Sequence, residues 1–176
     1  YGSEGHNSFP PTVQRANYLG RVMLLHSFVA PQPLILEEEI PFLKVWMFRA
    51  SIKKDPMRIS QYENWFSTSV ASIWFALILL GGSLFLKNLR KQDNRFSFAI
   101  ILILLFNFAL HMQYGKDVFL YATNWTYAIT LFFALAWREL AEKRWFQVLL
   151  LVFLGLVLAN NSQLFYTMLS TSALHI

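Results

Sequence analysis

The densest group of polar residues in the apolar part of the chain lies between two predicted membrane helices. It consists of His111, Tyr114, Asp117, Tyr121 and Asn124. Imidazole, phenol, carboxyl and amide groups can hydrogen-bond a phosphate or a sugar hydroxyl, and Gly115 allows a tight reversal between the helices. We therefore predict that these five residues form a substrate-binding rim. The same residues also suit an ordinary turn between helices, in which Asp117 caps the helix predicted at 118–137.

A second polar group lies in the N-terminal third of the chain and is basic. It consists of Arg15, Arg21, His26 and Arg49. Together these side chains could bind an anionic lipid headgroup or a pyrophosphate, because guanidinium groups form paired hydrogen bonds with phosphate oxygens. They also fit ordinary solvated surface charge, and both interpretations stay open.

Several kinds of chemistry find no support in the sequence. The chain has no cysteine, which excludes cysteine-based metal and cluster sites. His111 is the one histidine in or beside a predicted membrane helix, so haem ligation by two histidines of these helices is excluded, and a lone pigment or metal ligand is a minor alternative. Glu37-Glu38-Glu39 is typical of a solvated turn, and no Ser/His/Asp order or Gly-rich phosphate loop is recognisable. We assign no catalytic residue and no metal site, and we name no cofactor.

Long apolar stretches must position these groups. The hydrophobic fraction of the 176 residues is 56% and the mean hydropathy is +0.40, more than a water-soluble domain of this size carries. A helix needs about 20 apolar residues to cross the hydrocarbon core of a bilayer. Stretches that approach this length lie near residues 66–86, 96–112, 118–137 and 145–165. The predicted fold class is an all-α integral membrane protein with about four transmembrane helices.

The predicted spans differ in length. Residues 66–86 and 118–137 are long enough to cross alone, whereas 96–112 is shorter. The last span has about 15 strongly apolar residues before Asn160-Asn161-Ser162, so its helix must continue through these polar residues or break there. Because short spans need neighbours, the expected partners are other transmembrane helices or subunits, together with membrane lipids.

Residues 1–64 form a segment of mixed polarity ahead of the membrane domain, which covers residues 65–176. Apolar positions at helical spacing predict an amphipathic helix at 13–29, and Ala30-Pro31-Gln32-Pro33 then ends it. Short apolar runs at 34–36 and 42–48 predict strands or an interfacial stretch. The segment is therefore expected to lie outside the membrane and partly at its interface.

Basic residues orient the predicted spans. They gather after the first span, at Lys87, Arg90, Lys91 and Arg95, and after the third, at Arg138, Lys143 and Arg144. By the positive-inside rule both loops are cytoplasmic, which places residues 1–64, the 113–117 loop and the C-terminus on the outer face. Lys53, Lys54 and Arg58 oppose this orientation, but the two loops agree with each other. The loops account for much of the net charge of +5, and no basic stripe or aromatic motif indicates nucleic acid as a partner.

Two stretches resemble a known family of membrane enzymes. They are RVMLLHSFVAPQP at residues 21–33 and HMQYGKDVFLY at residues 111–121. With the order of outer segment, helix, basic loop, helix, short outer turn and helix, they resemble the C-terminal part of bacterial polytopic glycosyltransferases of the GT-C type. The resemblance covers most of the chain and implies a bacterial inner membrane, periplasmic termini and a lipid-linked sugar as substrate.

Enzymes of this type carry their catalytic carboxylate in the first outer loop of an N-terminal half. The chain begins at Tyr1 without Met, so we expect it to be part of a longer protein. The expected function is a non-catalytic membrane portion that helps form the lipid-linked substrate site and does not turn over alone. The alternative is a small accessory or structural subunit of a respiratory or photosynthetic complex, in which the 17 phenylalanines pack against a larger core. A transporter half is weaker, since no charged residue lies at a predicted membrane centre.

Overall fold

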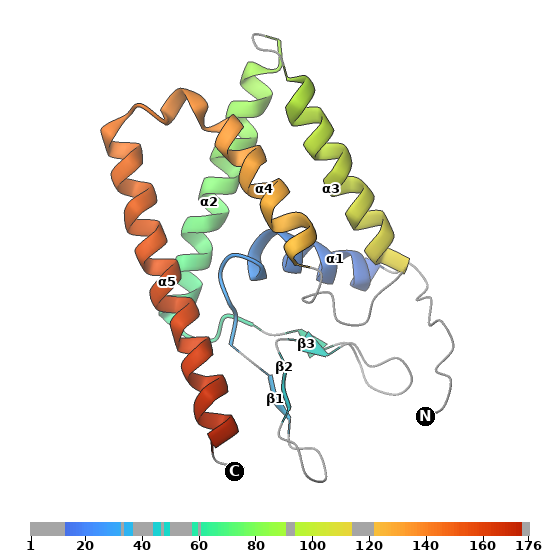
Figure 1. Cartoon of the computed structure of the whole chain (residues 1–176), viewed down its shortest axis with the longest axis vertical. Coiled ribbons are helices and arrows are strands. Elements are labelled where there is room, and N and C mark those ends of the chain that lie inside the picture. The colour runs from blue at the N-terminus through green and yellow to red at the C-terminus, as the bar shows by residue number, and fades with distance from the viewer. Residues whose placement is uncertain are drawn as a thin grey trace.

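Four helices that run alternately up and down form most of the described part of the chain (Figure 1). The computed structural model describes residues 13–32, 34–36, 44–46, 48–49, 58–59, 61–90, 94–113 and 122–173. The four helices are α2 (Trp65–Asn88), α3 (Arg95–Gln113), α4 (Thr123–Ala136) and α5 (Arg144–Ala173). In Figure 1, α2 and α4 begin and α3 and α5 end toward the same end of the bundle, which we call the lower end. The connections that carry the basic residues lie at the opposite, upper end.

Three of the helices are long and apolar enough to cross a membrane, namely α2, α3 and the part of α5 from Arg144 to Thr167. A helix satisfies its own backbone hydrogen bonds, which the hydrocarbon core requires. At the start of α2 the side chain of Asn64 accepts a hydrogen bond from the backbone N–H of Ser67 at 2.6 Å and caps the helix. The predicted fold class is confirmed: the chain is an all-α membrane protein in its main architecture.

The relative lengths of the last two helices differ from the sequence prediction. The described part of α4 has 14 residues, which span about 21 Å and fall short of the hydrocarbon thickness of about 30 Å. The predicted span at 118–137 also includes residues 118–121, which lie outside the described residues. Helix α5, in contrast, runs for 30 residues and continues without a break through Asn160, Asn161 and Ser162.

The N-terminal segment begins with a helix that crosses the bundle. Helix α1 (Val13–Arg21) passes directly into the π-helical turn η1 (Val22–His26), within the stretch predicted to be helical. Two antiparallel pairs of short strands follow, β1 (Leu34–Leu36) with β2 (Lys44–Trp46) and β3 (Phe48–Arg49) with β4 (Arg58–Ile59). Leu34 pairs with Trp46, and Phe48 pairs with Ile59.

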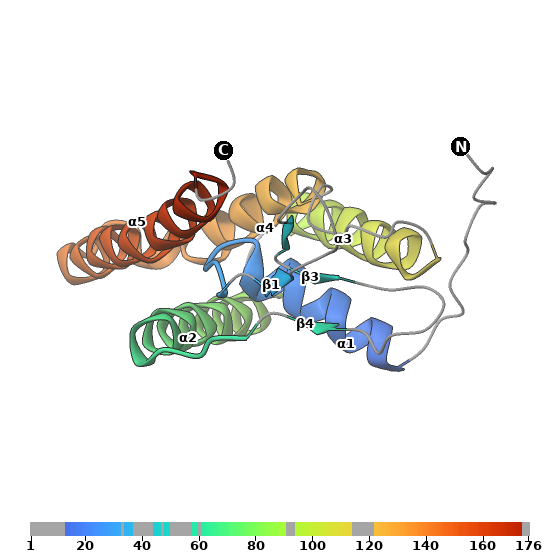
Figure 2. The same cartoon turned by 90° about the horizontal axis from the view of Figure 1, so that it is seen from below.

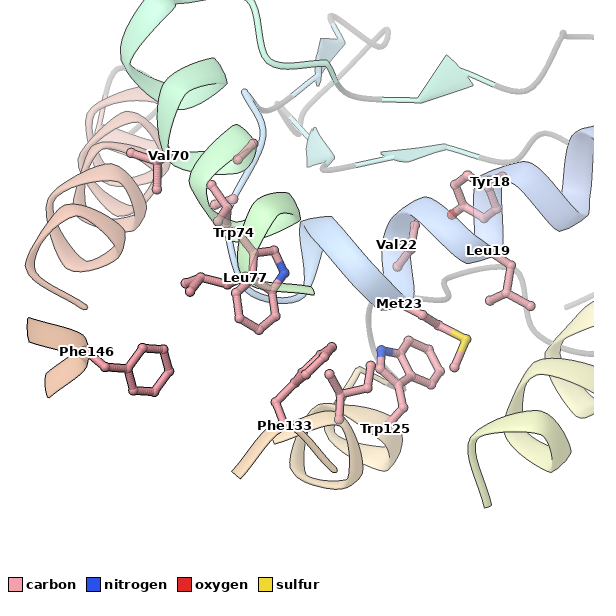
Figure 3. Close-up of a cluster of buried hydrophobic side chains, with 14 residues drawn as sticks. Tyr18, Leu19, Val22, Met23, Val70, Trp74, Leu77, Trp125, Phe133 and Phe146 are labelled. Carbon is pink, nitrogen blue, oxygen red and sulfur yellow. The ribbon is translucent and has the colours of Figure 1, made fainter. Parts of the chain in front are cut away.

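The core lies where α1 and η1 meet the long helices (Figure 3). Tyr18, Leu19, Val22 and Met23 are buried along α1 and η1, and Figure 3 shows Met23 beside Trp125 of α4 and Leu19 directed toward α3. Two indoles also hold the segment by hydrogen bonds: Trp74 Nε1 donates to the carbonyl of Leu24 at 2.6 Å, and Trp125 Nε1 donates to Ser27 Oγ at 3.0 Å. Helix α1 is therefore packed inside the lower part of the bundle, a deeper position than the amphipathic pattern indicates.

The outer faces of the long helices are apolar and exposed. From below, α5, α4 and α3 form one row, and α2 and α1 form a second (Figure 2). In the membrane-length window of α5 only 6% of the residues are buried, against 28% in α2. Exposed side chains on α5 include Leu151, Leu154 and Leu158. Such faces require lipid or further transmembrane helices as neighbours.

Candidate functional site

Two adjacent amides of α5 bind the segment that follows η1. Asn160 Nδ2 donates to the carbonyl of Ala30 at 2.9 Å, and Asn161 Nδ2 donates to the carbonyl of Phe28 at 3.1 Å. In return, Asn161 Oδ1 accepts from the backbone N–H of Ala30 at 2.9 Å. These contacts join residues more than a hundred positions apart in the sequence. They satisfy backbone groups of an irregular stretch that would otherwise lie unpaired against the helix.

A polar pocket opens beside these amides, between the start of α2 and the second half of α5. Its volume is about 330 Å³, part of which is open to the surroundings. Its lining comprises Ala30, Pro31, Gln32, Asn64, Ser67, Asn160, Gln163, Leu164 and Thr167. Six of these nine side chains are amides or hydroxyls and none is charged. The pocket therefore suits a neutral ligand with several hydroxyl groups, which both donate and accept hydrogen bonds.

Asn160 supplies an acceptor to this pocket. Its side chain is 3% exposed, and its Oδ1 atom has no hydrogen-bond partner among the described residues. A buried carbonyl oxygen without a partner costs about 1–3 kcal/mol, so a ligand that donates a hydrogen bond there would be favoured. Ser67 is likewise buried and Gln163 is exposed at the pocket. The lining of the pocket thus includes both buried and exposed polar side chains.

A groove with a positive charge lies further along α2. It is lined by Asn17, Gly20, Arg21, Leu24, Leu25 and Phe75, and its volume is about 530 Å³, much of it open to the surroundings. Arg21 is the basic side chain of this groove, and Phe75 and Leu24 are exposed beside it. The stretch from Arg21 to Gln32 contributes to both the groove and the polar pocket. A cation next to apolar side chains is the combination that an anionic amphiphile requires.

The structure separates the four residues of the predicted anion site. Arg15 is 3% exposed, and its Nε and Nη2 atoms donate to the backbone carbonyl of His111 at 3.1 and 2.7 Å. There it compensates the negative end of α3. His26 is also buried, Arg49 belongs to β3, and Arg21 lines the groove. Burial keeps Arg15 and His26 from contact with a headgroup, whereas Arg21 lines the groove.

The predicted rim between α3 and α4 is described only in part. Tyr114, Asp117 and Tyr121 lie outside the described residues. His111 is 4% exposed, and its ring meets Trp125 edge to face at a centroid distance of 5.2 Å. Asn124 is exposed at the start of α4. The ring of His111 therefore packs in the core of the lower end.

His26 is a buried titratable side chain within the stretch from Arg21 to Gln32 that contributes to both cavities. Its imidazole contacts Tyr62 edge to face at 5.5 Å, and Tyr62 donates its hydroxyl to the carbonyl of Val29 at 2.8 Å. Burial, with a smaller contribution from the charge of Arg21, lowers the pKa of His26 to about 4. Burial also raises the pKa of Tyr62. Both side chains are therefore neutral at pH 7.

The polar pocket was not among the sequence predictions. In the sequence, Asn160 and Asn161 are recognisable only as an interruption of the last predicted span. Amides inside an apolar run are a usable signal, because such groups face protein or cavity in membrane proteins. No group of three or more His, Asp or Glu able to hold a metal ion occurs in the part of the chain that the structure describes. Comparisons with protein-family models, curated proteins and solved structures find no match to the chain.

Proposed function

We propose that this chain is a non-catalytic membrane portion of a GT-C-like glycosyltransferase and that its lower end helps to form the site for a lipid-linked sugar. The observation that carries the proposal is the uncharged pocket of amides and hydroxyls at Asn64, Ser67, Asn160, Gln163 and Thr167. Amides and hydroxyls can form hydrogen bonds with sugar hydroxyls, because both partners can donate and accept. The buried Oδ1 of Asn160 would accept from one sugar hydroxyl.

The groove at Arg21 supports the same proposal. Its guanidinium would bind the phosphate of the carrier lipid, and Leu24 and Phe75 would contact the first part of the chain. Ser67 in the pocket and Phe75 in the groove are eight residues apart on α2, which corresponds to about 12 Å along the helix axis. That separation suits one amphiphile with a sugar, a phosphate and an apolar tail.

The proposal also fixes a location. In a bacterial inner membrane, the basic loops at the upper end would face the cytoplasm and the lower end would face the periplasm. The two basic loops share one end of the bundle (Figure 1), which the positive-inside rule requires of loops on one membrane face. Catalysis would depend on residues of another segment or subunit.

Binding of a polyprenyl-phosphate-linked hexose tests the proposal. In lipid nanodiscs the chain should bind this glycolipid about five- to tenfold more tightly than polyprenyl phosphate alone, the gain expected from one or two hydrogen bonds. Gln163→Ala should abolish most of that difference while binding of polyprenyl phosphate stays unchanged. The matched control is Gln147→Ala, which removes an exposed glutamine far from the pocket. Equal affinity of the intact chain for the two lipids would overturn the proposal.

An accessory subunit of a larger membrane complex is the second candidate. The observation that favours it is the exposed apolar face of α5, where few residues are buried. Under this alternative the native chain would purify with a pigment- or haem-bearing complex, and His111→Ala would change its absorbance. A colourless preparation that binds the glycolipid selectively would favour the glycosyltransferase portion instead.

A further inference from the structure

A second pocket lies at the upper end of the bundle, away from the candidate sugar site. It is a shallow depression of about 400 Å³, part of which is open to the surroundings, between the end of α2, the start of α3 and the end of α4. Its polar lining consists of Asn88, Asn94, Ser97 and Arg138. Its apolar lining consists of Leu84, Phe85, Phe96, Leu135 and Ala136. The pocket therefore combines polar groups, one of them positively charged, with apolar side chains.

Asn88 gives this pocket a buried acceptor. Its side chain is 4% exposed, and its Oδ1 atom has no hydrogen-bond partner among the residues that the structure describes. The surrounding backbone is held in place, because Asn94 Nδ2 donates to the carbonyls of Asn88 and Leu89 at 3.2 and 3.1 Å. These are the last carbonyls of α2, which need a partner. The side chain of Asn88 thus extends from a backbone that is held in place. Its unpaired Oδ1 atom favours a ligand with an N–H or O–H group.

The charge of the pocket indicates the rest of the ligand. Arg138 is exposed at the mouth of the pocket, and guanidinium groups bind phosphate in paired geometry. Phe96 is 62% exposed, and Phe85 packs edge to face on Phe98 and Phe132 of the neighbouring helices. The apolar wall thus continues into the faces that α2, α3 and α4 present to the membrane. A ligand here needs a phosphate, a donor group and an apolar tail.

We infer that this pocket binds a phospholipid whose headgroup carries both a phosphate and a hydrogen-bond donor. The phosphate contacts Arg138, the donor bonds Asn88 Oδ1, and an acyl chain lies along Phe85, Phe96 and Leu135. Phosphatidylethanolamine, with its ammonium group, and phosphatidylglycerol, with its hydroxyls, both meet these requirements. Phosphatidylcholine has the phosphate and no donor. The inference is independent of the proposed glycosyltransferase function, because no residue is shared between the two pockets.

Native mass spectrometry of the delipidated chain in a mild detergent tests the inference. Titration with each of the three lipids should show phosphatidylethanolamine or phosphatidylglycerol bound about fivefold more tightly than phosphatidylcholine, the gain expected from one hydrogen bond. Which of the two binds more tightly identifies the preferred donor. Equal binding of all three lipids would overturn the inference.

Two variants separate the contributions. Asn88→Leu should remove the preference over phosphatidylcholine while leaving the thermal stability without lipid unchanged or higher, since an unsatisfied amide is replaced by an apolar group. Arg138→Gln should weaken the binding of all three lipids about fivefold. Arg144→Gln, a matched change outside the pocket, should leave their binding unchanged. The inference fails if folded Asn88→Leu keeps the preference, or if the two arginine variants behave alike.

Discussion

The imidazole of His26 is enclosed by the core, and this has a consequence for stability in acid. It is 2% exposed, and neither ring nitrogen has a hydrogen-bond partner among the described residues. Its pKa in the folded chain is about 4, whereas an unfolded histidine titrates near 6.5. Between these two values the unfolded chain binds more protons than the folded chain. Lowering the pH through this window therefore favours unfolding.

The predicted effect of acid can be measured on the purified chain in detergent micelles. The free energy of unfolding should fall by at most about 3 kcal/mol as the pH drops from 6.5 to 4, through the His26 contribution alone. In His26→Phe, which keeps an aromatic ring against Tyr62, this part of the acid sensitivity should disappear. The measurement is the difference in Tm between pH 7 and pH 5 for both chains. If the Tm of both chains falls by the same amount between pH 7 and pH 5, His26 does not titrate as described.

The sequence identifies polar residues but not which of them meet. Arg15 and His111 were assigned to two different sites, and the structure joins them by hydrogen bonds across 96 positions. Burial decides such a pairing, and burial of an arginine beside a helix end cannot be read from local sequence. Asn160 is the opposite case, since its place in an apolar run was visible but its contact with Ala30 was not. Residue types were therefore predictable, and their partners depended on the tertiary fold.

At the scale of the elements, the contact between α2 and α4 depends on a single glycine. A Cβ atom added at Gly81 would meet the ring of Phe133 and lie 2.9 Å from Trp137 Nε1. Phe133 has little room to yield, because its ring stacks on Trp137 at 5.1 Å and meets Trp74 edge to face at 5.6 Å. At the adjacent Gly82 no atom lies within 4 Å of an added Cβ. The two glycines therefore form a matched pair.

Alanine at these two positions should have different effects. Gly81→Ala should destabilise the chain by about 1–3 kcal/mol, the usual cost of overpacking a filled core. Gly82→Ala should leave the stability unchanged or slightly raised, because alanine favours helix more than glycine does. Thermal unfolding of both variants in the same detergent measures the difference. Equal Tm values for the two would show that α2 and α4 are not in close contact at Gly81.

The helices themselves were predictable to different degrees. Helices α2 and α3 lie where long apolar runs place them, because such runs need no tertiary partner to be recognised. The continuation of α5 through Asn160 was one of two options, and the structure selects it because these amides bind the N-terminal segment. The burial of α1 and η1 was not predictable from the amphipathic pattern, since it depends on the contact of α1 with α3 and on the indoles of Trp74 and Trp125, which bond Leu24 and Ser27.

At the scale of the whole molecule, the two ends of the bundle differ in chemistry. The lower end has the crossing helix α1 (Figure 1). The uncharged pocket and the groove at Arg21 lie beside the segment that continues from α1. The upper end carries the basic loops and the pocket at Asn88. The proposed functions need these ends on opposite faces of the membrane. This separation is the central claim, and it also requires α4 to cross even though its described part is short.

Thiol labelling of single-cysteine variants tests this separation most directly, and the chain suits it because it has no native cysteine. The four variants are Gln61→Cys and Thr123→Cys at the lower end, Gln92→Cys, which lies between α2 and α3 in the sequence, and Ala141→Cys between α4 and α5. With an impermeant maleimide on intact bacterial cells made permeable in the outer membrane, the first two should label. The last two should label only after the inner membrane is opened. Labelling of Thr123→Cys and Ala141→Cys from the same side would contradict the account.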